Sequence, residues 1–214
     1  MPRHLIPDAP AGRGDPRRRP PRVVLGPISK RALAWILAPA ALLLLLHTFV
    51  IGTLHVVGVS MADTLEPGDL VLISKLAVTR SRILGSVDPA RSYRPDRGDV
   101  VAFRLPQKPS LLLVKRVVGL AGDRVVVEHG ALHVRDAGGA AWPDPALAGY
   151  ARARLEVTAG SLDVVVPRDA LFVIGDNRGA GASSDSRDWG CLPSDAVVGR
   201  VVLLLHPFAR AGPL

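Results

Sequence analysis

The apolar positions of this chain fall into one long run followed by many short ones. From Ala32 to Ala62 there is no Asp, Glu, Lys or Arg, and the densest part, Leu33 to Leu54, is apolar on every side of a helix. About 20 apolar residues in a helix cross the core of a bilayer. Pro39 would kink such a helix but is tolerated in membranes. The run therefore predicts one N-terminal transmembrane helix, and we expect an anchor over residues 32–57.

A cleaved secretory signal is the competing interpretation of this run. Its apolar region would be shorter, and a cleavage site of the small-x-small type would follow it. Here the run is longer and Gly58-Val59-Ser60-Met61 follows, which favours a retained anchor.

The charge of the chain is concentrated before this run. Residues 1–31 hold eight basic and two acidic residues among seven prolines, so most of the net charge of +8 lies there. Such a segment buries too little apolar surface to offset its ordering entropy, which predicts a disordered basic tail. Basic residues before a span keep that side in the cytoplasm. We therefore expect a single-pass protein of the cytoplasmic membrane, with its N-terminus inside and the rest of the chain outside.

Short apolar segments separated by Gly, Pro and Asp follow the long run and predict a mostly β domain. Residues 129–161 differ, because Gly, Ala and Pro dominate there and the periodicity is weak, so we expect a small inserted cap. The β core then consists of residues 58–128 and 162–208, with a C-terminal tail at 209–214. The expected strands are residues 69–74, 100–103, 111–118, 124–127, 162–166, 171–174 and 197–205.

Composition argues against several classes of function. One cysteine, Cys191, rules out an internal disulfide, and no group of Cys and His has the spacing of a zinc site, so we expect no metal and no cofactor. Beyond residue 31 the basic and acidic residues nearly balance, and aromatic residues make up only 4% of the chain. A nucleic-acid partner is therefore not expected.

Lys115 and Arg116 occupy adjacent positions of an expected apolar strand. Alternate residues of a strand face opposite sides, so the two side chains must point in opposite directions. If both faces of the sheet are covered, one basic group enters a desolvated site. Burial would lower the pKa of the lysine and make a neutral amine available as a base. The alternative is that both side chains reach water from an edge strand.

Ser60 lies just past the apolar run, where a nucleophile would sit at the membrane surface. A serine hydroxyl is a poor nucleophile until a neighbour accepts its proton, and a neutral Lys115 can do this without a histidine. The amide of Ser60 and the flexible backbone at Gly58 are the candidate oxyanion hole. The polar stretch from Gly175 to Gly190 is either a well-capped loop or a set of groups that orients the lysine.

Together these segments resemble the bacterial type I signal peptidases, membrane-bound Ser/Lys proteases that remove signal peptides from exported preproteins. Five blocks in one order are more specific than any one of them. The blocks are Ser60-Met61 with Thr64-Leu65 and Gly68-Asp69; Arg97-Gly98-Asp99-Val100-Val101; Lys115-Arg116-Val117-Val118-Gly119 with Gly122-Asp123; Gly175-Asp176-Asn177-Arg178; and Ser183 with Asp185-Ser186-Arg187 and Trp189-Gly190.

The resemblance implies a role for each residue of the site. Ser60 would be the nucleophile, Lys115 the general base and Ser183 the hydroxyl that holds the lysine amine, with Ser184 as the alternative because the loop before them is rich in glycine. The residues that would brace the site without reacting are Asp176, Asp185 and Arg187.

The resemblance also implies a mostly β catalytic core with an inserted cap, and exported preproteins with signal peptides as partners beside the lipid bilayer. A precursor presents its cleavage site just outside its own apolar segment, where an active site near the anchor's outer end meets it. An extended substrate could pair with the strand at Leu112 to Val114. The apolar residues expected to line pockets for small side chains are Val56, Met61, Leu65, Leu112 and Val114.

Three other functions share some of these features. A self-cleaving Ser/Lys repressor would need a DNA-binding domain where this chain has the apolar run. A non-catalytic, membrane-tethered β module would not need both Ser60 and Lys115. A peptidase dedicated to one conjugation or pilus substrate remains an alternative to a general processing enzyme.

Overall fold

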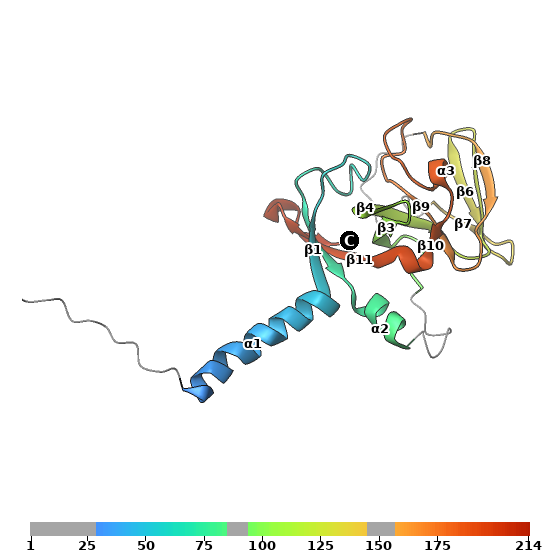
Figure 1. Cartoon of the computed structure of the whole chain (residues 1–214). Coiled ribbons are helices and arrows are strands. Elements are labelled where there is room, and N and C mark those ends of the chain that lie inside the picture. Colours follow the sequence, from blue (N-terminus) through green and yellow to red (C-terminus); the bar gives the residue numbers. More distant parts are fainter. Residues whose placement is uncertain (1–28, 85–93, 145–156) are drawn as a thin grey trace, which may run out of the picture. The chain divides into compact units, whose positions relative to one another are not determined.

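The computed structural model describes residues 29–84, 94–144 and 157–214, and the chain divides into two units, residues 1–39 and 40–214 (Figure 1). Most of the expected basic tail, residues 1–28, therefore lies outside the described residues.

Helix α1 (Lys30–Phe49) is built from Ala and Leu and contains Pro39. Within the described part of the chain, no helix meets the length and apolarity required to cross a membrane. The expected anchor also differs from the structure at its end, because residues 51–55 form strand β1. Its partner strand explains the change, since all five residues of β1 pair antiparallel with β2 (Leu70–Ser74).

Beyond α1, two antiparallel sheets dominate the described chain, so the mostly β prediction is confirmed. The larger sheet has the order β1-β2-β11-β3-β4-β9-β10, with β12 paired to β11, and the smaller has the order β7-β6-β5-β8. The remaining strands are β3 (Val100–Leu105), β4 (Lys108–Gly119), β5 (Arg124–Glu128), β6 (Ala131–Arg135), β7 (Ala141–Trp142), β8 (Leu162–Val165), β9 (Ala170–Ile174), β10 (Leu192–Pro193), β11 (Val197–His206) and β12 (Gly212–Pro213). The short helices are α2 (Leu76–Leu84), α3 (Ser186–Trp189), η3 (Ser194–Ala196) and η4 (Phe208–Arg210).

The structure also differs from the expected boundaries at two further places. The smaller sheet reaches beyond residues 129–161 on both sides, because β5 and β8 pair with each other and belong to it. Its strands carry buried valines and leucines that the weak periodicity around them concealed. The expected tail at 209–214 is also part of the core, since β12 pairs with β11.

Three Gly-Asp dipeptides form the turns that lead into β2, β3 and β5. Each glycine has a positive φ, 94° at Gly68, 94° at Gly98 and 87° at Gly122, a conformation that side chains with a Cβ rarely adopt. Each aspartate then accepts a hydrogen bond from the backbone amide three residues before it, so the turn caps itself. These bonds are Glu66 N to Asp69 Oδ2 at 2.8 Å, Asp96 N to Asp99 Oδ2 at 3.0 Å, and Leu120 N to Asp123 Oδ2 at 2.7 Å.

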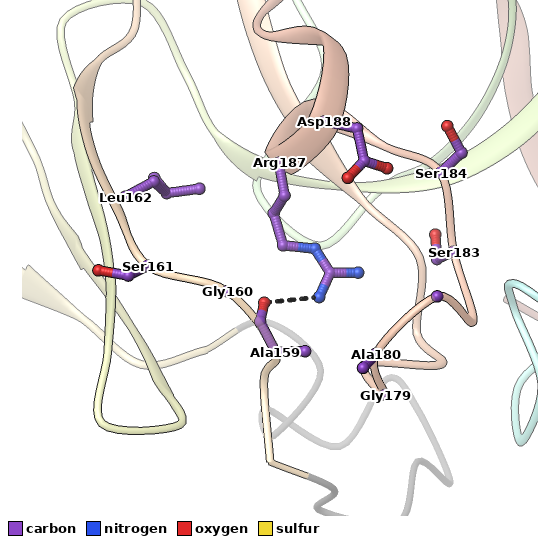
Figure 2. A pocket seen from close by; sticks show the side chains of 11 residues that line it. Ala159, Gly160, Ser161, Leu162, Gly179, Ala180, Ser183, Ser184, Arg187 and Asp188 are labelled. Atoms are coloured by element: carbon purple, nitrogen blue, oxygen red, sulfur yellow. Dashed lines mark hydrogen bonds between the residues drawn. The ribbon is translucent and has the colours of Figure 1, made fainter.

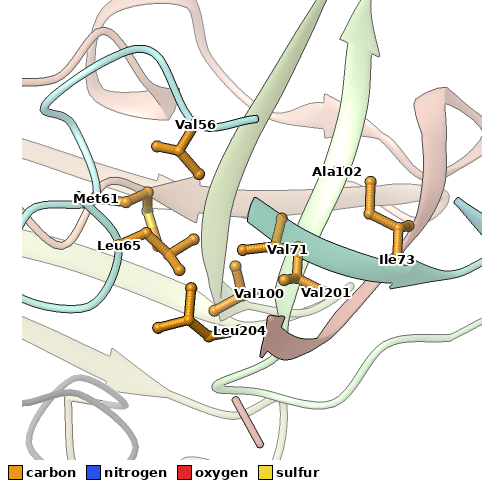
Figure 3. Packing of buried hydrophobic residues seen from close by; sticks show 9 residues of the cluster. All are labelled: Val56, Met61, Leu65, Val71, Ile73, Val100, Ala102, Val201 and Leu204. Atoms are coloured by element: carbon orange, nitrogen blue, oxygen red, sulfur yellow. The ribbon is translucent and has the colours of Figure 1, made fainter. Parts of the chain in front are cut away.

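The apolar core has three clusters, and one of them lies under the loop that carries Ser60. In this cluster Met61 and Leu65, from that loop, pack with residues of β2, β3 and β11 (Figure 3). A second cluster gathers around Phe103 and Val117, and a third joins Phe172 of β9 to the smaller sheet. The Ser60 loop is therefore supported from within by the same core that holds the main sheet together.

The pairing of β1 predicts how the chain tolerates N-terminal truncation. A chain that begins at Val50 keeps β1 and the buried Val56, whereas a chain that begins at Gly58 loses both. Burial of one such side chain contributes roughly 2 kcal/mol. We expect the shorter chain to unfold about 4–8 °C lower in a thermal melt followed by circular dichroism. Equal melting temperatures would show that β1 adds no stability.

Candidate active site

Ser60 and Lys115, 55 positions apart in the sequence, meet in the structure. The Nζ of Lys115 lies 2.5 Å from the Oγ of Ser60, within hydrogen-bond distance. Ser60 begins a tight turn in which the amide of Leu65 donates to the carbonyl of Met61 at 2.7 Å. The turn belongs to a loop, residues 56–69, which we call the nucleophile loop. Its two ends are joined because the amide of Val56 donates to the carbonyl of Asp69 at 2.8 Å.

Lys115 is held in a desolvated position by strand β4, where it lies opposite Val101 of β3. Only 2% of its surface is exposed. Burial lowers the pKa of Lys115 from 10.5 to about 8, because a desolvated ammonium is disfavoured. The negative charges of Asp185 and Asp176 oppose this change, and the positive charge of Arg187 adds to it. The amine is therefore neutral in a substantial fraction of molecules near pH 8.

Arg116, the next residue of β4, is buried as well and holds three segments together. Its guanidinium donates two hydrogen bonds to the carboxylate of Asp176, at 2.8 and 2.7 Å. It also donates to the carbonyl of Gly98 at 2.7 Å and reaches the hydroxyl of Thr64 at 3.4 Å. Lys115 and Arg116 are thus both buried, and the alternative in which they reach water from an edge strand is wrong.

Ser183, Asp185 and Arg187 form a connected polar group beside the lysine. The hydroxyl of Ser183 donates to Oδ2 of Asp185 at 2.6 Å, and the amide of Gly175 donates to the same oxygen at 3.0 Å. Arg187 donates to both carboxylate oxygens of Asp185, at 2.8 and 2.9 Å. Burial alone would raise the pKa of Asp185, but the hydrogen bonds from Arg187, Ser183 and Gly175, together with the positive charge of Arg187, outweigh burial and lower it.

The remaining donors of Arg187 reach backbone carbonyls. Its Nη1 donates at 3.1 Å to the carbonyls of both Ala159 and Arg178, and Figure 2 shows the side chain extending from α3 across an open pocket to Ala159. The pocket is lined by residues 159–162, 179–181, 183–184 and 187–188. Arg187 therefore joins α3 to two other segments and fixes the position of Asp185.

Ser183 and Ser184 differ clearly in exposure and in hydrogen bonding. Ser183 is 7% exposed and bonded to Asp185, whereas the neighbouring Ser184 is exposed. In the described residues Ser183 makes no hydrogen bond to Lys115. Because the hydroxyl of Ser183 donates its hydrogen bond to Asp185, the Ser183 oxygen stays available as an acceptor.

Two residues at the site, Gly175 and Asn177, were given no role from the sequence. A Cβ at Gly175 would overlap both the Oγ of Ser183 and the carbonyl oxygen of Ser60, so only glycine lets these groups approach. The amide of Asn177 donates to the carbonyl of Ser60 at 3.1 Å, and its side chain donates to the carbonyl of Val59 at 3.2 Å. The Gly-Asp-Asn-Arg block marked this segment, but the contact with Ser60 is a product of the fold.

The candidate oxyanion donors are free to act. Among the described residues, the backbone amides of Gly58 and Ser60 have no hydrogen-bond acceptor. Gly58 is exposed, and a Cβ built on it would meet nothing within 4 Å. Among the described residues, the nucleophile loop therefore has an amide without an acceptor on either side of Val59.

The residues expected to line substrate pockets separate into two groups. Val56, Met61 and Leu65 are buried at 8%, 2% and 0% exposure and belong to the core under the nucleophile loop (Figure 3). Leu112 and Val114 pack against the same core but are partly exposed. The sequence marked apolar neighbours of Ser60 without distinguishing those that support the loop from those that face outward.

The chain is similar in sequence to proteins of one family. The sequence model of the family described as signal peptidase, peptidase S26, matches residues 29–206. The chain is 32% identical to signal peptidase I of Bacillus caldolyticus, over 77% of this chain and 85% of that protein. It is 31% identical to the mitochondrial ATP-independent inner membrane protease subunit 1a of Arabidopsis thaliana, over 87% and 90%. A crystal structure of a signal peptidase I from Enterococcus faecalis is 28% identical, with a TM-score of 0.40 over 51% of this chain and 97% of that one.

The position of Ser183 predicts different effects for two adjacent alanine substitutions. Ser183→Ala removes a buried hydrogen bond to a charged carboxylate, which contributes about 1.5–3 kcal/mol. We expect it to lower kcat at least about tenfold with little change in KM, because it disturbs the groups around Lys115 and not a substrate contact. Ser184→Ala, at an exposed position, is the matched control. A larger loss of kcat in Ser184→Ala would transfer the role to that residue.

Proposed function

This chain belongs to the signal peptidase family, peptidase S26, whose members are serine endopeptidases that remove signal peptides, and we propose that it does so with Ser60 as nucleophile and Lys115 as base. The observation that carries this assignment is the 2.5 Å contact between the serine hydroxyl and a buried lysine amine. The lowered pKa of Lys115, about 8, supports the role, because only the neutral amine can accept a proton.

Each step of peptide hydrolysis then has a group in place. Neutral Lys115 Nζ takes the proton of Ser60 Oγ as the oxygen attacks the scissile carbonyl carbon, and the amides of Ser60 and Gly58 donate to the resulting oxyanion. The lysine ammonium returns the proton to the leaving amine, which leaves an ester on Ser60. Water, deprotonated by the same amine, attacks the ester carbonyl, and the lysine ammonium returns that proton to Ser60 Oγ as the acyl group leaves as a carboxylic acid.

The polar group around Asp185 positions the lysine in this proposal. Asp185 and Asp176 both attract the lysine ammonium, but each is bonded to its own arginine, Arg187 and Arg116. Pairing with an arginine limits how strongly each carboxylate stabilises the charged lysine. Ser183 donates a hydrogen bond to Asp185, and its oxygen can accept one from the amine of Lys115. None of these residues exchanges a proton with the substrate.

The proposed substrate is an exported preprotein that binds as an added strand. Strand β4 pairs with β9 only from Arg116 onward, so its edge at Leu112 to Val114 has no strand partner on that side in the described structure. An extended peptide laid along this edge would bring a carbonyl past Ser60. Leu112 and Val114 are partly exposed there, and we assign them, and not the buried Met61 and Leu65, to contact with small substrate side chains.

Signal peptidases act at membranes, and the N-terminal sequence supports a single span in this chain. The apolar run from Ala32 lies between the basic tail and β1, which favours a cytoplasmic N-terminus, a bilayer anchor and a catalytic domain outside.

The pH dependence of activity tests the role of Lys115. Activity requires the neutral amine, so kcat/KM should rise with pH up to about 8 and become constant above it. Lys115→Arg keeps the charge but stays protonated at every usable pH, so its activity should vanish. Labelling by a serine-reactive probe should be lost in Ser60→Ala. A folded Lys115→Arg enzyme that keeps more than about a tenth of the wild-type rate, a loss below ~1.4 kcal/mol, would overturn the dyad.

The proposed topology predicts the outcome of protease treatment of intact cells. A protease added outside should digest residues after β1 and leave an epitope at the N-terminus intact. The control is the same digestion after the membrane is opened with detergent, which should also remove the epitope. Loss of the epitope in intact cells would reverse the assigned orientation.

A further inference from the structure

Residues 207–214 fold back onto the region of the nucleophile loop. The guanidinium of Arg210, at the end of η4, forms an ion pair with Oδ1 of Asp69 and lies 3.4 Å from Oε2 of Glu66. Asp69 is 2% exposed, while Arg210 is 25% exposed. Burying a carboxylate is costly unless it is paired or hydrogen-bonded. Arg210 supplies the paired cation from 141 positions later in the sequence.

Asp69 is the residue at which the nucleophile loop closes. One oxygen of its carboxylate accepts the amide of Glu66 at 2.8 Å, and its carbonyl accepts the amide of Val56 at 2.8 Å. The amide of Gly68 donates back to the carbonyl of Val56, also at 2.8 Å. Any displacement of the Asp69 side chain is therefore passed to both ends of the loop, and Ser60 lies between them.

The segment that carries Arg210 is itself held on the sheet. Gly212 of β12 pairs with Leu204 of β11, whose side chain packs in the same cluster as Met61 and Leu65 (Figure 3). Leu214 packs against that cluster, and its amide donates to the carbonyl of Val202 at 3.1 Å. Arg210 is thus attached to the core and can act as a fixed point for the loop.

The other two Gly-Asp turns provide the comparison. Each aspartate has an arginine partner, Arg200 for Asp99 and Arg97 for Asp123. Only Asp69 lies in the loop that carries Ser60. The Arg97–Asp123 pair matches it in burial, with side chains 15% and 2% exposed, but it lies at the turn into β5.

We propose that Arg210 is a positioning residue, which holds the nucleophile loop at Asp69 so that Ser60 Oγ stays within reach of Lys115. The proposal rests on the assignment of Ser60 as the nucleophile. Because loss of alignment between reacting groups lowers the rate of the chemical step, the effect should appear in kcat and not in KM.

The test compares Arg210→Ala with Arg97→Ala in the full-length chain in detergent, with a fluorogenic peptide that contains an Ala-x-Ala cleavage site. Both variants lose one half-buried ion pair, so their melting temperatures should fall by similar amounts. Arg210→Ala should lower kcat about tenfold with unchanged KM, and should slow labelling of Ser60 by a serine-reactive probe equally. Arg97→Ala should keep both rates within about twofold of wild type. Measurements are made well below the lower melting temperature.

The outcomes separate this inference from the proposed function. Full activity of Ser60→Ala would overturn the dyad itself. If Ser60→Ala is inactive, but a folded Arg210→Ala has the same kcat as Arg97→Ala, only the role of Arg210 is overturned. If Arg210→Ala does not fold, Asp69→Asn removes the same charge pair with an isosteric side chain and is measured in the same way. Failure of both variants to fold would make the contact purely structural and would also overturn the proposal.

Discussion

The burial of one lysine amine beside a serine hydroxyl is the constraint on which the rest of the structure depends. A desolvated ammonium is disfavoured, and this gives Lys115 a pKa of about 8 and makes it usable as a base. Two carboxylates, Asp185 and Asp176, lie close enough to reverse the effect. The fold limits their influence by bonding Asp185 to Arg187 and Asp176 to Arg116. Pairing of these carboxylates with arginines thus favours the neutral state of the lysine amine.

These ion pairs also determine which segments meet at the site. The buried Arg116–Asp176 pair connects β4 to the Gly-Asp-Asn-Arg segment, and Arg187 connects α3 to Ala159. Buried pairs contribute little net stability, because desolvation offsets much of their attraction, but removal of one partner leaves a costly unpaired charge. They therefore favour one arrangement of the loops over alternatives more than they add to the free energy of unfolding.

Sequence patterns predicted the strands well where alternation was regular and turns were marked by Gly-Asp, as in β2, β3, β4 and β5. They failed where pairing decided the structure. Residues 51–55 continue an apolar run that reads as helix, and they become β1 because β2 offers an antiparallel edge. The short β12 lies in a segment with no strand pattern of its own and exists through its pairing with β11.

The sequence by itself determined the chemistry available to this protein. It supplies one serine just after an apolar run, a lysine and an arginine on opposite faces of one strand, and a block of aspartates and arginines, since residue type and the alternation of a strand are local properties. The tertiary structure decided which groups meet. It buried Lys115, which lowers the pKa of this residue, and it placed Arg187, and not the adjacent Arg116, as the cation that adds to this lowering. It also buried Met61 and Leu65 under the loop. Contacts between residues tens of positions apart depend on packing and sheet order, which no local pattern encodes.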